Sequence, residues 1–149
     1  METNYKNLEF ILNGLVKRYK KRVPEVTKIL DLLIQDGALK NESAMINDHI
    51  AFRTMGVANL GISSMEKIFL HYGYVKMDYL YFEEKKLNAF WYHPPKPEYP
   101  RIFISELRVA DLSPSIQNTI FKYTNQVNSD PVDTIDLDDP TAVDSFLHK

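Results

Sequence analysis

The sequence predicts an α+β fold, in which two helices precede a β-α-β-β-β module and a further helix and an acidic tail follow it. Three observations support this prediction. Apolar residues recur at helical spacing through the first 40 residues. Four later stretches alternate with period two, which is typical of strands. A single stretch of helical spacing separates the first of these strands from the second. The expected boundaries are 1–40 for a helical hairpin, 44–109 for the module and 111–149 for the helix and tail.

The composition bounds the class of protein. The chain has 149 residues, near the usual size of one domain, so a single domain over 1–149 is expected. A net charge of −2 gives no electrostatic footprint for nucleic acid or anionic lipid. The absence of cysteine excludes disulfides, thiolate nucleophiles and zinc–cysteine sites. There is no signal-peptide pattern and no apolar run near about 18 residues, so we expect a soluble cytoplasmic protein that binds neither membrane nor nucleic acid.

The first 40 residues predict two helices that form a hairpin. The apolar residues of the first helix share one face: Leu8, Ile11, Leu12, Leu15, Val16 and Tyr19. Basic residues at 17–22 crowd its end, where cations suit the helix dipole; a polyanion patch is the less favoured interpretation. Pro24 suits the first turn of a second helix, and Gly37 suits the position just after its end.

The stretch Asn-Asp-His-Ile-Ala-Phe-Arg-Thr, which begins at residue 47, predicts a strand with two different faces. Ile50 and Phe52 suit a core, whereas His49, Ala51 and Arg53 fall on the opposite face. The Cα atoms of His49 and Arg53 are expected about 13 Å apart, four residues at about 3.3 Å each. A small dicarboxylic acid lying over Ala51 would bridge a metal on His49 and the guanidinium of Arg53. The alternative is a solvated strand face that carries a histidine and an arginine.

The module continues with a short helix and a pair of strands. Ser63 or Ser64 is expected to cap the helix, and Gly73 to end it. Period-two alternation predicts strands at 75–82 and 87–92. The charged residues between these strands are interpreted as a solvated turn.

A carboxylate lies in the last predicted strand, which covers 101–109 and follows a proline-rich loop. Glu106 shares a face of this strand with apolar residues and with Arg108. A carboxylate in such a position is either paired or a ligand. Pairing with Arg108 or Arg53 and ligation of a metal are both open.

The remainder predicts one more helix and a turn-rich tail. Asp111 or Ser113 is expected to cap this helix, with Pro114 in its first turn. Its buried side is expected at helical spacing: Ile116, Ile120, Tyr123 and Val127. Residues 141–147 predict a further helical stretch. The acidic run that begins at Asp136 lacks the glycine and the closing glutamate of a calcium loop, so no metal is assigned to it.

The order β-α-β-β-β resembles the repeat of vicinal-oxygen-chelate proteins, which include the glyoxalases and extradiol dioxygenases. In those folds, two modules form a cupped sheet around one metal, and the ligands come from the first and last strands of a module. His49 and Glu106 lie on the first and last predicted strands here. A glyoxalase-like isomerase or an extradiol dioxygenase shares this fold, although either would need different substrate contacts.

Specific motifs resemble the 2-oxoadipate dioxygenase/decarboxylase family, which has a glyoxalase-like fold. They lie at 47–54, 66–74, 84–89, 101–109 (Arg-Ile-Phe-Ile-Ser-Glu-Leu-Arg-Val) and 136–140. The resemblance implies an iron(II) enzyme that uses dioxygen to convert 2-oxoadipate into 2-hydroxyglutarate and carbon dioxide in lysine catabolism. It also implies a metal site of two histidines and one glutamate.

The resemblance assigns two residues of this chain. His49 matches the family's first metal-binding histidine, and Arg53 matches its substrate-binding arginine. The second histidine and the ligating glutamate of the family lie in a C-terminal half that this sequence does not reach, and ligand status is not carried over to Glu106. The chain is therefore expected to resemble the N-terminal half of the enzyme, as a truncated gene, a fragment or one module assembled in trans.

A second class of function remains open at this point. The chain would then be a non-catalytic half-module that binds a carboxylate through Arg53 or pairs with a partner chain. An apolar sheet face left for a second module favours association. A dimer is one such arrangement, and it would bring two copies of His49 and of Glu106 together.

Overall fold

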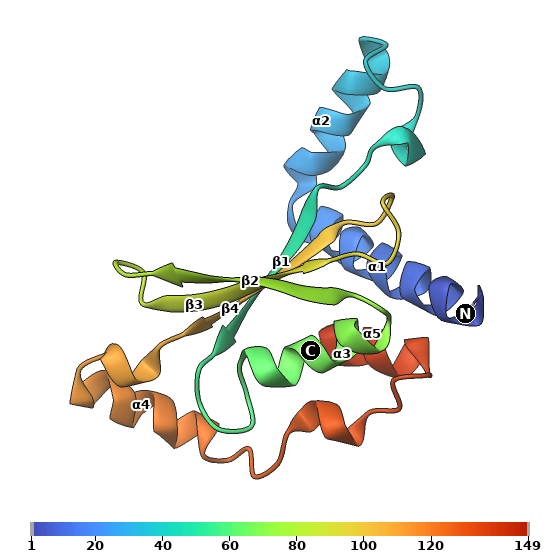
Figure 1. Cartoon of the computed structure of the whole chain (residues 1–149). Coiled ribbons are helices and arrows are strands. Elements are labelled where there is room, and N and C mark those ends of the chain that lie inside the picture. The colour runs from blue at the N-terminus through green and yellow to red at the C-terminus, as the bar shows by residue number, and fades with distance from the viewer. Residues whose placement is uncertain (1, 149) are drawn as a thin grey trace. The chain divides into compact units, whose positions relative to one another are not determined.

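The computed structural model describes residues 2–148. The helices and strands are α1 (Glu2–Arg22), α2 (Pro24–Gln35), β1 (His49–Met55), α3 (Ile62–His71), β2 (Val75–Phe82), β3 (Leu87–His93), β4 (Arg101–Leu107), α4 (Pro114–Thr124) and α5 (Pro140–His148) (Figure 1). The predicted order of two helices, a β-α-β-β-β module, a helix and a tail is confirmed. The described chain forms two compact units, residues 2–47 with 136–148 and residues 48–135. The predicted single domain with boundaries near 40, 44 and 111 stays a prediction.

The first unit is held together by packing between α1 and α5. Leu8 and Ile11 of α1 and Val143 of α5 are fully buried. An ion pair between Arg18 and Asp144, 2.7 Å from nitrogen to oxygen, joins the same two helices. α1 makes more of its contacts with α5 than with α2, so the predicted hairpin is not the main packing of this unit.

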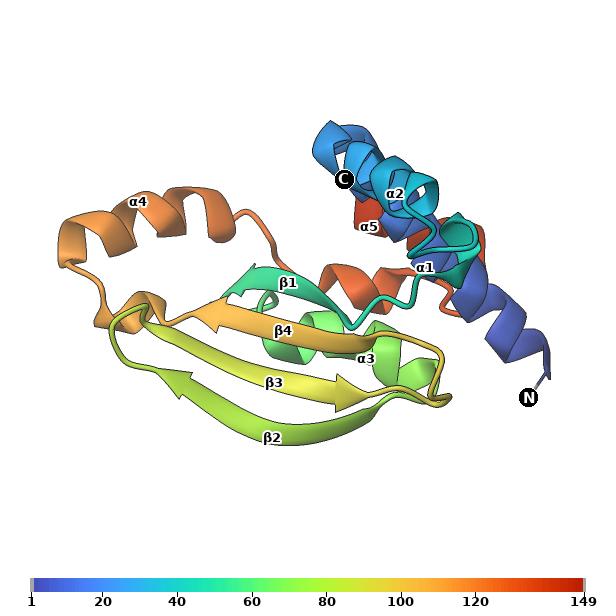
Figure 2. The same ribbon diagram turned by 90° about the horizontal axis from the view of Figure 1, so that it is seen from above.

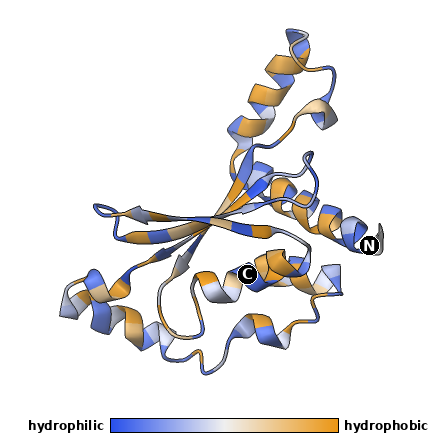
Figure 3. Ribbon diagram, in the orientation of Figure 1, coloured by the Kyte–Doolittle hydropathy of each residue, from blue (hydrophilic) through white to orange (hydrophobic). Residues whose placement is uncertain are grey.

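Helix α2 follows α1 after the single residue Val23 and ends as predicted. Pro24 occupies its first turn, and Gly37 adopts φ +75° just beyond its end. Apolar and polar residues alternate along α2 (Figure 3). Leu30 is its buried residue, whereas Ile29 and Leu32 are exposed in the structure of residues 2–148.

The second unit is built on a four-stranded sheet of order β1-β4-β3-β2 (Figure 2). β1 pairs with β4 in parallel, and the other two pairs are antiparallel. The connection from β1 to β2 passes through α3, which lies along one face of the sheet (Figures 1 and 2). This is the glyoxalase-like topology that the sequence predicts.

The face of the sheet beneath α3 forms the core of this unit. Ile102 and Ile104 of β4 and Ile68 of α3 are fully buried. The rings of Phe52 and Phe69 lie 5.3 Å apart and join β1 to α3. α3 therefore covers this face of the sheet, whereas His49, Ala51 and Arg53 of β1 are exposed on the opposite face, which we call the open face.

A buried tyrosine links α3 to the sheet by a polar contact. The hydroxyl of Tyr92 on β3 donates a hydrogen bond of 2.6 Å to Glu66 Oε2. Burial and this neighbouring carboxylate raise the pKa of Tyr92 well above its usual range. Lys76 of β2 forms an ion pair with the same carboxylate, 2.8 Å from nitrogen to oxygen.

Helix α4 does not bury the face that the sequence predicts. Pro114 occupies its first turn as expected, but no residue of α4 is buried, and the exposed fractions of Ile116 and Tyr123 are 50% and 72%. The prediction of a buried side is wrong because periodicity defines an apolar stripe without showing what lies against it. No helix within residues 2–148 is long and apolar enough to cross a membrane.

Two isoleucines of the second unit, one buried and one exposed, predict different losses of stability when each is replaced by alanine. Ile68→Ala removes a fully buried side chain from α3, so we expect the free energy of unfolding to fall by about 2–5 kcal/mol. Ile116→Ala on the exposed side of α4 is the matched control, with an expected change within about 0.5 kcal/mol. Denaturant unfolding of both variants measures the difference. Equal losses would show that α4 is packed in solution.

Candidate functional site

Strand β1 presents the predicted pair of faces. His49, Ala51 and Arg53 are exposed, whereas the alternate residues are half-buried on the side of α3. The hydroxyl of Thr54, on the α3 side, donates a hydrogen bond of 2.9 Å to the carbonyl of Ser105. The alternation predicted from the sequence is therefore present, and His49 and Arg53 lie on the same open face.

The imidazole of His49 is held by a neighbouring carboxylate. His49 Nδ1 lies 2.9 Å from Asp48 Oδ2, and Arg101 Nη1 lies 3.1 Å from Asp48 Oδ1. An ionised carboxylate only accepts hydrogen bonds, so Nδ1 carries the proton and donates it. The lone pair of neutral His49 is then on Nε2, the nitrogen that a metal would take. A carboxylate on the second ring nitrogen is a common partner of metal-binding histidines.

The same contacts fix the charge of Asp48. The hydrogen bond from His49 lowers the pKa of the Asp48 carboxyl below its ordinary value, and the positive charge of Arg101 lowers it further. The register places Arg101 directly beside His49, because these two residues are partners in the parallel pairing of β4 with β1. Arg101 thus keeps Asp48 charged and in reach of the imidazole.

A hollow of about 330 Å³ opens on the same face at the Arg53 end of β1. Its lining residues come from all four strands and the β2–β3 turn: Ala51, Phe52, Arg53, Phe82, Lys85, Leu87, Phe103 and Ser105. Ala51 and Arg53 line it as predicted, but His49 is not among its lining residues. His49 and Arg53 thus share a face of β1, as the sequence predicts, but they do not line the same hollow.

Glu106 lies on the opposite face of the sheet from His49. It is the register partner of Thr54, whereas Arg53 is the partner of Ser105. Glu106 Oε2 accepts a hydrogen bond of 3.0 Å from the backbone N–H of Ile62, at the start of α3. The predicted pairing of Glu106 with Arg108 or Arg53 is therefore wrong, because the carboxylate stabilises the positive end of a helix dipole instead.

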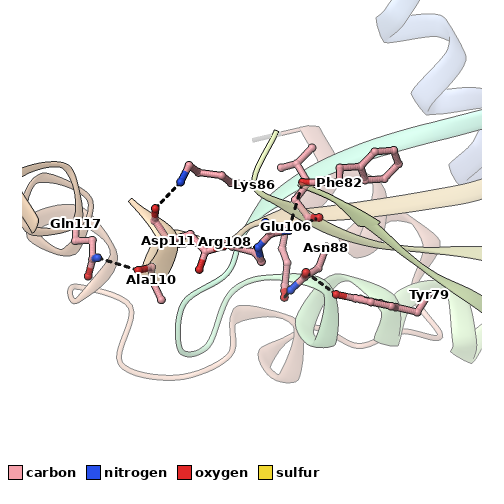
Figure 4. A network of polar contacts seen from close by, with 10 residues as sticks. Tyr79, Phe82, Lys86, Asn88, Glu106, Arg108, Ala110, Asp111 and Gln117 are labelled. Carbon is pink, nitrogen blue, oxygen red and sulfur yellow. Dashed lines mark hydrogen bonds and ion pairs between the residues drawn. The ribbon is translucent and has the colours of Figure 1, made fainter. Parts of the chain in front are cut away.

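Figure 4 shows the polar network around Glu106 and the contacts that Arg108, one of its expected partners, makes instead. Asn88 bridges Glu106 Oε1 and the hydroxyl of Tyr79, at 3.4 and 2.7 Å. Arg108 pairs with Asp111 and donates to the carbonyl of Leu87 at 2.9 Å. Glu106 is thus enclosed on the α3 side of the sheet, away from the open face.

The start of α3 corrects a second prediction. Gly61, at φ +95°, is the N-cap residue, and both serines that follow lie inside the helix. Ser64 Oγ instead donates a hydrogen bond of 2.6 Å to Asp130. A Cβ at Gly61 would lie 2.7 Å from Glu106 Oε2, so the glycine leaves room for the carboxylate that takes over the cap.

A profile of the 2-oxoadipate dioxygenase/decarboxylase family matches residues 11–149. The chain belongs to this family. The chloroplastic 2-oxoadipate dioxygenase/decarboxylase of Arabidopsis thaliana is 37% identical over 125 residues, which are 76% of this chain and 33% of that protein. The chloroplastic/amyloplastic protein of Oryza sativa subsp. japonica is 40% identical over 124 residues, with the same coverage. The cytoplasmic location of this chain stays a prediction.

Two solved structures share the fold of this family member. The hydroxyglutarate synthase of Oryza sativa, in complex with 2-oxoadipate, superposes with a TM-score of 0.73 at 35% identity and covers 84% of this chain and 42% of its own. A putative hydrolase from Shewanella frigidimarina gives a TM-score of 0.69 at 37% identity, over 79% and 44%. The chain therefore spans about a third of the curated relatives and less than half of these solved chains.

On the open face, His49 is the side chain that suits a metal ligand. Within residues 2–148, no three histidine or acidic side chains are grouped so that they could hold a metal together. His49, with Nδ1 engaged by Asp48, suits a single Nε2 ligand. The roles of His49 as metal ligand and Arg53 as substrate-binding residue stay predictions for this family member.

Two residues near His49 and Arg53 were not predicted from the sequence. Strict alternation places Asp48 on the same face as Ile50 and Phe52, but Asp48 precedes β1 and its carboxylate contacts the His49 ring. Lys85 was interpreted as part of a solvated turn, yet it lines the hollow with Arg53. The only signal for Asp48 in the sequence is a carboxylate next to a histidine, and none distinguishes Lys85 from Lys86.

We expect Asp48→Ala to change the tautomer of neutral His49. Without the carboxylate acceptor, Nδ1 loses the partner that holds its proton, and the proton redistributes to Nε2. Nitrogen-15 chemical shifts of the imidazoles above about pH 8, where histidines are neutral, measure this change. His93, whose Nδ1 lies 2.8 Å from the carbonyl of Pro94, is the internal control and is expected to keep its tautomer. An unchanged His49 would contradict the role of Asp48.

Glu106→Ala is expected to destabilise the fold rather than to alter the open face. It leaves the Ile62 N–H at the start of α3 without its acceptor, which costs about 1–2 kcal/mol. Glu98→Ala is the control, since Glu98 is an exposed residue of the loop before β4. Denaturant unfolding measures the loss, and the His49 nitrogen shifts are expected to stay as in the unsubstituted chain. Changed shifts would place Glu106 within reach of His49.

Proposed function

We propose that this chain is part of an iron(II)-dependent 2-oxoadipate dioxygenase/decarboxylase, which forms 2-hydroxyglutarate and carbon dioxide in lysine catabolism. One observation carries the proposal: an oriented imidazole and a guanidinium share the open face of a sheet whose fold and sequence match a synthase that was solved with 2-oxoadipate. One 2-oxoadipate and one dioxygen account for all atoms of the two products.

His49 and Arg53 take separate roles in this proposal. His49 would hold iron(II) through Nε2, while Asp48 keeps the Nδ1 proton in place. Arg53 would bind the distal carboxylate of 2-oxoadipate, because a guanidinium matches a carboxylate with two parallel hydrogen bonds. When bound, the iron would activate dioxygen and bind the 2-oxo acid group. The family resemblance assigns the other two metal ligands to a histidine and a glutamate outside this chain.

The open face also needs a cover for this chemistry. Oxidative decarboxylation requires that water be excluded from the reacting groups. A second module of the kind that the family resemblance implies would supply that cover together with the missing ligands. Half-buried Phe103 and Trp91 on the open face suit burial against such a module.

A second candidate is a non-catalytic half-module that binds a carboxylate or a partner chain. It is favoured because no three histidine or acidic side chains within residues 2–148 are grouped so that they could hold a metal. A dimer through the open face would bring two His49 side chains together. It would not bring two Glu106 side chains to them, since Glu106 lies on the opposite face.

Oxygen consumption and carbon dioxide release with 2-oxoadipate and iron(II) distinguish these functions. We expect little turnover by the chain alone, because proteins hold catalytic metals with about three ligands. Turnover is expected when the chain is co-expressed with the C-terminal part of an intact family member. Failure of every such combination, with both parts folded, would favour the half-module.

Substitutions separate the two roles in the combined protein. His49→Ala is expected to abolish metal-dependent oxygen uptake, because it removes a ligand. Arg53→Ala is expected to raise the KM for 2-oxoadipate by about 10-fold or more and to leave iron bound, because it removes a charge-assisted hydrogen-bonded pair. His71→Ala is the control, since that histidine lies exposed on α3. Loss of bound iron in Arg53→Ala would contradict the assignment.

A further inference from the structure

Strand β2 forms one outer edge of the four-stranded sheet (Figure 2). Its backbone pairs with a neighbouring strand, β3, along one side only. An edge strand of this kind presents a row of N–H and C=O groups to which a further strand can bind. The other edge strand of the sheet is β1, which carries His49 and Arg53.

The large apolar side chains that the sheet exposes gather on β2. The exposed fractions of Val75, Met77, Tyr79 and Tyr81 lie between 39% and 57%. In β1, which lies wholly within the described residues, no large apolar side chain is exposed to this extent. α3 packs mainly against β4 and β1, so it leaves Tyr79 and Tyr81 uncovered. Exposed apolar area of this kind favours association.

The regular half of β2 begins at Tyr79. A bulge between Lys76 and Tyr79 interrupts the pairing with β3, and bulges and lysines protect an edge from further pairing. From Tyr79 to Phe82 the pairing with β3 is continuous, and this segment contains no proline, glycine or charged residue. A further strand therefore fits residues 79–82 better than the start of β2.

This segment is complementary to itself in the antiparallel direction. Antiparallel pairing centred on Leu80 places Tyr79 of one copy opposite Tyr81 of the other, and aromatic pairs of this kind stabilise neighbouring strands. It also brings Lys76, near the start of β2, toward Glu84, which follows its end. Opposite charges at the two ends of the strand favour this direction over a parallel one.

We propose that the edge of β2 is an interaction surface for a second copy of this chain, and that the two β2 strands pair antiparallel about a twofold axis at Leu80. The two four-stranded sheets then join into one continuous sheet. Paired residues project to the same side, so both open faces lie on one side of the joined sheet and stay uncovered. The inference goes beyond the proposed function and needs neither metal nor substrate.

Sedimentation of the 149-residue chain measures the association. We expect a monomer–dimer equilibrium between about 1 μM and 1 mM, without larger species, because twofold pairing occupies the β2 edge of both copies. A chain that stays monomeric throughout this range would overturn the inference.

A single introduced cysteine tests the register, since the sequence contains no cysteine of its own. Leu80→Cys places two thiols opposite each other, with Cα atoms about 4.5–5.5 Å apart, which is within the range of a disulfide. We therefore expect mild oxidation to convert most of this variant into a linked dimer. Val75→Cys is the matched control, because Val75 is more exposed than Leu80 but its two copies would lie about 33 Å apart. Equal cross-linking of the two variants would overturn the proposed pairing.

Tyr81→Glu tests the aromatic side of the interface. It removes the contact with Tyr79 of the second copy and places a charge on the paired edge, so we expect the Kd of the dimer to rise about tenfold or more. The fold is expected to persist, because the new carboxylate lies near Arg108, whose guanidinium carbon is 4.0 Å from the Tyr81 ring centroid. Denaturant unfolding of dilute protein checks this. Tyr123→Glu on exposed α4 is the control and is expected to leave the Kd unchanged. Equal Kd values for the two variants would contradict the inference.

The C-terminal part of an intact family member distinguishes a second copy from the rest of the family's fold. We expect Leu80→Cys to cross-link in the presence of that part as well. Loss of the cross-link would assign the edge of β2 to the C-terminal part and overturn the inference. A dimer that persists while every combined protein fails to consume oxygen would remove the proposed enzyme and leave the β2 interface in place.

Discussion

The parallel pairing of β1 with β4 is the constraint on which the rest of the site depends. It sets His49 beside Arg101 and Arg53 beside Ser105, and it sends Thr54 and Glu106 to the other face. Paired residues project to the same side of a sheet, so one register distributes all these groups. A slip of one residue would exchange the two faces and bring Glu106 to the open side.

Local periodicity was sufficient to predict the strands, their order along the chain and the two faces of β1. It needs only neighbours along the chain, and the alternation of exposed His49 and Arg53 with half-buried Phe52 follows directly. The partners of Glu106 could not be predicted in this way. Its donor is a backbone N–H 44 residues away, at Ile62, and that contact depends on the turn at Gly61. The prediction of a buried side of α4 failed for the same reason, because an apolar stripe does not specify which element packs against it.

The turn between β2 and β3 gives two adjacent lysines, Lys85 and Lys86, different contacts. Lys86 adopts φ +51°, a conformation that reverses the direction of the chain before β3. Its ammonium reaches the carbonyl of Asp111, whereas Lys85 lines the hollow. Four charged residues in succession predict a turn, but the contacts of its two lysines depend on the turn geometry. Composition and spacing do not predict this difference between the two lysines.

In the proposed function, the open face would recognise a carboxylate at one end of β1 and bind a metal at the other. Arg53 would supply its cation from this chain alone, so this end of the proposed site needs no other part of the family's fold. A catalytic metal needs about three protein ligands, of which His49 would be one in the proposed function. Asp48 orients that imidazole whether or not the other ligands are present. In the proposed function, this chain would therefore supply an oriented imidazole at one end of β1 and a guanidinium farther along it, and only the metal end would depend on a second module.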